Sequence, residues 1–105
     1  MVTATLRITN IEHRADATRK TLPFSSIEGS DIIIASPLSE NAQLNEHLVW
    51  FWGTLKHERR FLKSLQAGGG KLTIHAAVRH GVVEIKPDGA ELLHLLGATL
   101  LINGQ

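Results

Sequence analysis

The stretch that decides the fold is SENAQLNEHLVWFWGTLKHERRFLKSLQAGGG, residues 39–70 of the 105-residue chain. Apolar side chains recur in it at steps of three and four residues, which is the spacing of one face of an α-helix. They are Leu44, Leu48, Phe51, Leu55, Leu62 and Leu65. Ser39 can cap the first turn, and the glycines at 68–70 stop a helix near Ala67. The pattern predicts one long helix whose apolar side packs on a sheet.

Strands are predicted on both sides of this helix. Residues 2–9 alternate between apolar and polar types, which is typical of a half-buried strand. Three consecutive isoleucines at 32–34 indicate a short buried strand. Alternation resumes over residues 72–78, and His80-Gly81 then predicts a two-residue turn into a second strand over residues 83–86. Leu72, Ile74, Ala76 and Val78 would share a face with Val83 and Ile85 in that hairpin.

Residues 10–30 carry no clear periodicity. They are polar and irregular, with Pro23 and Gly29 among a few scattered apolar residues. We interpret them as a long loop or an irregular edge segment. A structureless stretch of this length is uncommon in a compact domain, so a short strand near residues 22–26 is the alternative.

The C-terminal part adds one helix and one strand. Asp88 and Glu91 have the spacing of a capping box, and Gly97 follows the leucine-rich turn that they open. Residues 98–102 are then a last strand. The predicted order is β-β-α-β-β-α-β, in a single domain over residues 1–105. We expect an α+β fold with a ferredoxin-like split β-α-β core from Ile32 onward, an antiparallel sheet, two helices on one face and an extra N-terminal strand.

Residues 31–102 resemble a bacterial domain family of unknown function, numbered 4279 among such families. The motifs that carry the resemblance are Leu44-Asn-Glu-His47-Leu48 in the long helix and Leu96-Gly97-Ala98-Thr-Leu100 near the end. They fall mostly at core and cap positions. The resemblance implies the same fold and supplies no activity, cofactor or mechanism.

Composition excludes several classes of function. Eleven basic residues balance 10 acidic ones, which argues against a nucleic-acid partner or a charged membrane surface. The chain has no cysteine, so disulfides, thiolate nucleophiles and cysteine-based metal sites are excluded. The longest mostly apolar run, around residues 92–102, is too short to span a bilayer. We therefore expect a cytoplasmic protein without a membrane segment.

Six histidines prompt a test for metal binding: His13, His47, His57, His75, His80 and His94. None of the pairs has the three- or four-residue spacing that places two ligands on one helix face. The glycines at 68–70 follow a helix, whereas a phosphate loop opens one. We therefore predict no metal, no cofactor and no catalytic residue.

The long helix carries a second stripe beside its core face. Trp50, Thr54, His57 and Phe61 lie at steps of four, three and four residues, about 100° or more from the core stripe. Two explanations stay open. Residues 10–30 could fold over the two aromatics through Leu22, Phe24 or Ile27, or the stripe could be an interface, where large aromatics are favoured anchors.

The leading hypothesis is a non-enzymatic binding or protein-interaction module that self-associates as a homodimer. A different protein is the other possible partner. The second stripe, the unpaired terminal strand and the missing catalytic set motivate this hypothesis. The alternative is a small-molecule-sensing domain or small enzyme that uses the polar sheet face. Its candidate residues are His75, Arg79, Glu84 and Lys86 across the predicted hairpin, although such a row is also typical of an ordinary solvated face.

Overall fold

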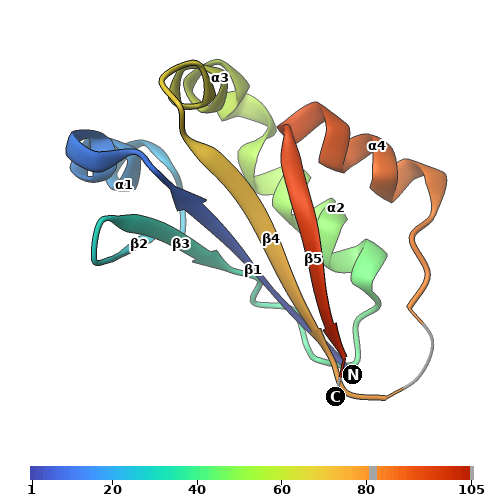
Figure 1. The fold of residues 1–105 in the computed structure, drawn as a ribbon. Coiled ribbons are helices and arrows are strands. Elements are labelled where there is room, and N and C mark those ends of the chain that lie inside the picture. The colour runs from blue at the N-terminus through green and yellow to red at the C-terminus, as the bar shows by residue number, and fades with distance from the viewer. Residues whose placement is uncertain (81–82, 105) are drawn as a thin grey trace.

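The computed structural model describes residues 1–80 and 83–104 and shows an α+β domain with a five-stranded mixed open sheet (Figure 1). The strands stand in the order β2-β3-β1-β4-β5. They are β1 (Val2–Thr9), β2 (Ser26–Glu28), β3 (Asp31–Ala35), β4 (Lys71–Val78) and β5 (Ala98–Gly104). The helices are η1 (Glu12–Arg14), α1 (Ala15–Thr21), α2 (Leu44–Leu55), η2 (Lys56–Glu58), α3 (Arg59–Ala67) and α4 (Pro87–Leu96).

Strand β1 is the centre of the sheet. It pairs antiparallel with β3 on one side and with β4 on the other, and Leu6 lies opposite both Ile34 and Ile74. The even-numbered residues of β1 and β4 are buried, which confirms the alternation predicted for both strands. Figure 1 shows α2, α3 and α4 behind the sheet. We call the other side, which carries the odd-numbered residues of β1, β4 and β5, the open face.

The predicted long helix is present but interrupted. Its six core-stripe residues are all buried, as expected from their spacing. A 3-10 turn, η2, separates α2 from α3. The helix also begins later than predicted, at Leu44, because Gln43 and Glu46 form the capping box there. The backbone N–H of Gln43 donates to Glu46 Oε1 at 3.0 Å. Ser39, the predicted cap, lies outside the helix, and its Oγ accepts from the backbone N–H of Asn41 within a turn.

The segment predicted as a long loop contains η1, α1 and β2. Helix α1 has seven residues and buries only Thr18, so no apolar period marks it in the sequence. Tertiary contacts hold it, because the Arg14 guanidinium at its start donates to Ser64 O and Ser64 Oγ of α3, both at 3.1 Å. A short strand is the alternative prediction near residues 22–26. Strand β2 lies at residues 26–28 and overlaps that range only at Ser26.

The predicted hairpin is wrong over residues 83–86, which form no strand. Gly81 of its predicted His80-Gly81 turn lies outside the described residues. The reason lies in α2. Asn45 Oδ1 accepts from the Lys86 amide at 3.2 Å, and its Nδ2 donates to Asp88 Oδ1 at 3.1 Å, so this segment is bound to α2 instead of to β4.

Strand β5 therefore takes the place beside β4, and it runs parallel to it. The sheet is mixed, not antiparallel as predicted. The α+β class is confirmed. The ferredoxin-like strand order and the arrangement of just two helices on one face are not confirmed. Within residues 1–80 and 83–104, no helix combines the length and the apolar composition needed to cross a membrane.

Gly89 is predicted to be required for the packing of α4 on α2. A Cβ added at Gly89 would collide with the buried Asn45 side chain, whereas one added at Gly53, exposed within α2, would meet nothing. We expect Gly89→Ala to lower the free energy of unfolding by about 1–3 kcal/mol. The matched control, Gly53→Ala, should raise it by roughly 0.5–1 kcal/mol, because alanine favours a helix interior. Urea titrations of both variants measure the two changes, and equal effects would contradict the packing argument.

Candidate functional site

The aromatic stripe of α2 and α3 is partly covered by the chain itself. The Phe24 ring lies 5.8 Å from the half-buried Trp50 ring, centroid to centroid, at an interplanar angle of 52°. Phe24 has a φ of 60°, an unfavourable conformation for an aromatic residue, and it is 75% exposed. Phe24 thus adopts a strained backbone conformation in which its ring packs on Trp50, although most of its side chain remains exposed to solvent.

The same cover extends to the second aromatic residue of the stripe. The Arg14 guanidinium carbon lies 5.8 Å from the centroid of the Phe61 ring, a cation–π distance. Thr54 is half-buried and His57 is exposed between the two aromatics. Of the three residues expected to cover the stripe, Phe24 packs on Trp50, whereas Arg14, which is not among them, lies over Phe61. The use of Trp50, Thr54, His57 and Phe61 as an interface stays a prediction.

The four candidate ligand-binding residues are not brought together as one cluster. His75 lies in β4 between Thr5 of β1 and Leu101 of β5, and Arg79 follows the end of β4. Glu84 and Lys86 lie in the segment that leads into α4, beyond the sheet. The expected row across a hairpin is absent because residues 83–86 do not pair with β4. Arg79 instead borders a hollow of about 380 Å³ with Met1, Thr3, Glu40 and Ala77.

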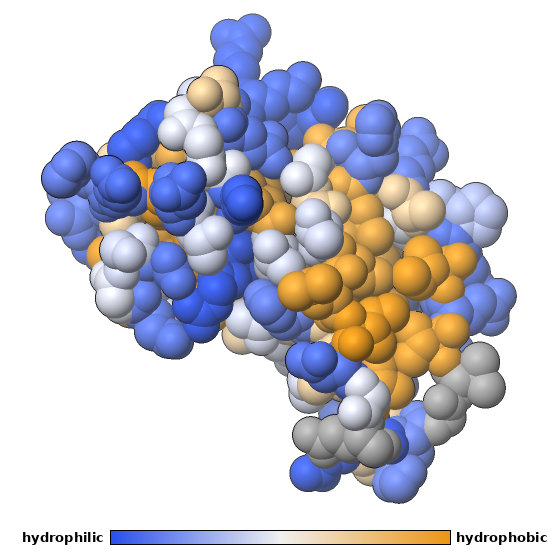
Figure 2. All heavy atoms as spheres, viewed as in Figure 1, coloured by the Kyte–Doolittle hydropathy of each residue, from blue (hydrophilic) through white to orange (hydrophobic). Residues whose placement is uncertain are grey.

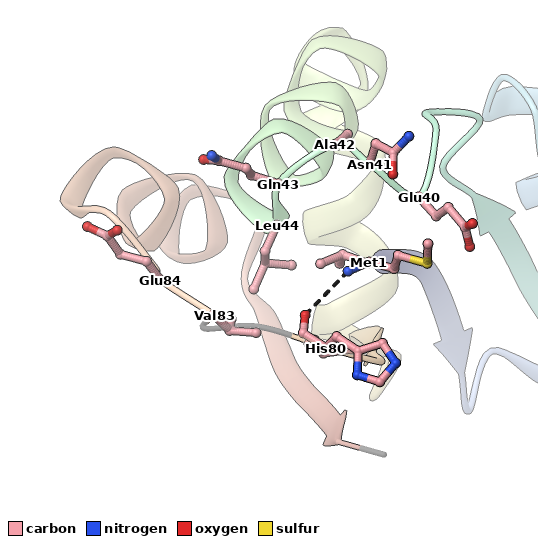
Figure 3. Close-up of a pocket in the computed structure, with 11 residues that line it drawn as sticks. Met1, Glu40, Asn41, Ala42, Gln43, Leu44, His80, Val83 and Glu84 are labelled. Atoms are coloured by element: carbon pink, nitrogen blue, oxygen red, sulfur yellow. Dashed lines mark hydrogen bonds between the residues drawn. The ribbon is translucent and has the colours of Figure 1, made fainter.

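A cavity of about 190 Å³ lies where the start of β1 meets the turn before α2. Figure 3 shows the Leu44 and Val83 side chains reaching toward the space beside Met1, whereas the Glu84 carboxylate points away from it. Small-molecule sites usually enclose roughly 300 Å³ or more and gather a few convergent polar groups. This cavity is smaller than that.

His47 is a fully buried polar residue within the core of α2. Its Nε2 lies 3.0 Å from Val2 O and its Nδ1 lies 2.7 Å from Ser36 Oγ. A carbonyl can only accept, so Nε2 carries the proton and donates to Val2, and Nδ1 accepts from the Ser36 hydroxyl. A serine bonded to a histidine invites comparison with a nucleophile and its base, yet the other ring nitrogen meets the Val2 carbonyl and not a carboxylate that would orient a base. The contact instead joins α2 to β1 and to the end of β3.

The outer edge of β5 carries two exposed apolar side chains next to each other in the chain. Leu101 and Ile102 are 48% and 43% exposed, on opposite faces of the strand. Figure 2 shows apolar side chains gathered over β5 and toward the segment before α4, where Ile85 is also exposed. In the described part of the chain, no further strand pairs with this side of β5. The sequence predicted an unpaired terminal strand. It did not predict that β5 pairs in parallel with β4, which determines which edge of β5 stays free.

Comparison with other proteins adds no relative. No known protein family, curated protein or solved structure matches the chain. The resemblance to the numbered family of unknown function therefore stays a prediction. Residues 1–80 and 83–104 also contain no group of three or more histidine, aspartate or glutamate side chains placed to hold a metal ion.

The buried imidazole of His47 should make the free energy of unfolding depend on pH. Burial, the largest cause, lowers the pKa of His47 below its ordinary value of 6.5, against weaker opposing effects of the Val2 hydrogen bond and Glu46. The unfolded chain therefore binds a proton more readily than the folded chain between the lowered pKa and about 6.5. Stability from this group is complete above pH 6.5 and falls as the pH drops toward the lowered pKa, by at most about 1.4 kcal/mol per pH unit.

The measurement compares urea unfolding of the wild type and His47→Gln between pH 8 and pH 5. Glutamine cannot take up a proton in this range, so the loss of unfolding free energy between pH 6.5 and pH 5 should be smaller in the variant. The Gly53→Ala variant, which changes no titrating group, gives the control and should retain the wild-type pH dependence. Identical profiles for the wild type and His47→Gln would contradict the role of His47.

Proposed function

We propose that the protein is a non-enzymatic interaction module that self-associates. The observation that supports this most directly is the outer edge of β5, with which no strand pairs in residues 1–80 and 83–104. Its seven residues include no charged side chain. A free strand edge offers a row of backbone N–H and C=O groups to another chain. Monomeric proteins usually protect such edges with lysine, proline or a bulge, and none of these protections lies between Ala98 and Gly104.

The two ends of the sheet differ in this respect. The opposite edge strand, β2, has only three residues and includes Glu28. The Arg7 guanidinium donates to Glu28 Oε1 at 3.0 Å and to Asp31 Oδ2 at 2.7 Å, and these bonds raise the pKa of Arg7. A short edge that carries charged side chains is poorly suited to pairing. The sheet therefore has one protected edge and one edge that fits association.

Catalysis and metabolite sensing have weaker support. The residues proposed for the sensing alternative lie in different segments, and the histidine of the serine–histidine pair is buried and bonded to the Val2 carbonyl. Leu101 and Ile102 together with the half-buried leucines of α4 provide apolar contact area instead. Exposed apolar patches rimmed by polar residues mark interaction surfaces in soluble proteins.

Sedimentation velocity over a range of protein concentrations tests this proposal. The wild type should sediment as an oligomer that dissociates on dilution. Leu101→Lys should raise the dissociation constant by at least about tenfold, since it removes apolar contact and places a charge on the edge. Val49→Lys is the matched control, because Val49 is 49% exposed on α2, and it should leave association unchanged.

Two outcomes would contradict the proposal. A wild-type chain that remains monomeric at all accessible concentrations would remove self-association. Equal weakening by Leu101→Lys and Val49→Lys would show that added charge acts without regard to the β5 edge. Trp50→Ala provides the remaining comparison, because loss of association in this variant alone would move the interface to the aromatic stripe.

A further inference from the structure

The free edge of β5 favours one specific arrangement of two chains, which rests on the proposed self-association. We infer that two copies of the chain pair antiparallel along β5, about a two-fold axis at Leu101, and join their sheets into one. Homodimers most often have two-fold symmetry, which brings the same surface of both copies together. An edge strand can meet itself in this way only in the antiparallel direction.

The side chains of β5 match themselves in this register. Pairing about Leu101 places each residue opposite the one equally far on the other side of the centre. Leu101 then faces Leu101 of the second copy, and Leu100 faces Ile102. Thr99 faces Asn103, and Ala98 faces Gly104. Apolar residues thus meet apolar residues, and the two polar residues meet each other, over the full length of the strand.

Neighbouring two-fold registers lack this match. Centring on Leu100 would place Thr99 opposite Leu101, and centring on Ile102 would place Leu101 opposite Asn103. Both arrangements also leave part of the seven-residue strand without a partner residue. Directly opposed side chains are the main unit of stabilisation between strands, so the register about Leu101 is favoured over both.

The surroundings of the edge also favour a second copy as its occupant. Leu101 on the open face and Ile102 on the opposite face are each about half exposed, so each face of the joined sheet gains apolar contacts at the seam. Because β5 is uncharged throughout, its two-fold copy brings no like charges opposite each other. Residues 101–104 are exposed, which leaves the edge open to approach.

Single cysteines test the register, since the chain has none of its own. Opposed residues of antiparallel strands have Cα atoms roughly 4.5–5.5 Å apart, within the range that a disulfide spans. Leu101→Cys should therefore form a covalent dimer under mild oxidation. Thr99→Cys should not cross-link to itself, because the two positions would lie about 13 Å apart along the strands. An equimolar mixture of Thr99→Cys and Asn103→Cys, refolded together, should give the mixed disulfide.

The outcomes separate this register from self-association as such. The register is overturned if the wild type associates but Thr99→Cys or Trp50→Cys cross-links to itself and Leu101→Cys does not. A wild type that stays monomeric overturns the register together with the proposed function. Far-UV circular dichroism of the reduced variants verifies that each has the wild-type fold. Thr99 and Asn103 are both exposed and polar, so their cysteine variants should fold. The mixed disulfide between them still tests the register if Leu101→Cys fails to fold.

Discussion

The pairing of β1 on both of its edges is the constraint on which the rest of the structure depends. Its buried residues Leu6 and Ile8 each lie opposite a buried residue of β3 and one of β4. Both neighbours are antiparallel to β1, so they run in the same direction and the chain between them has to cross the sheet. The helices α2 and α3 make that crossing, and their core stripe covers the buried face of β1.

Buried polar side chains then determine how the remaining segments attach to this layer. His47 donates to Val2 O and accepts from Ser36, which holds α2 against the start of β1 and the end of β3. Asn45 accepts from the amide of Lys86 and donates to Asp88, which holds the start of α4 against α2. Buried polar groups need such partners to offset their lost hydration. Because α4 is held there, the chain returns as β5 parallel to β4.

This return leaves the sheet with two unlike edges. At β2 the strand is short, and Arg7 bonds to Glu28 and Asp31 beside it. At β5 the strand is longer, carries no charge and has an exposed apolar residue on each face, Leu101 and Ile102. Meanwhile the aromatic stripe, which looks like an interface in the sequence, has Phe24 on Trp50 and Arg14 on Phe61. The uncharged edge of β5, with which no strand of the described residues pairs on its outer side, therefore supports the proposed association more directly than the helix does.

The sequence by itself determined the elements that have a strong period of their own. The alternation in β1 and β4 and the stripe from Leu44 to Leu65 predicted three core elements, and Gly97, with a φ of 67°, ends α4 as predicted. Only the tertiary structure decided the rest. Helix α1 depends on Arg14 contacts with Ser64, and residues 83–86 leave the sheet because Asn45 binds Lys86 and Asp88. Contacts between residues some 40 or 50 positions apart leave no local pattern. For this reason the partner of β4, and with it the free edge of the sheet, could not be read from spacing alone.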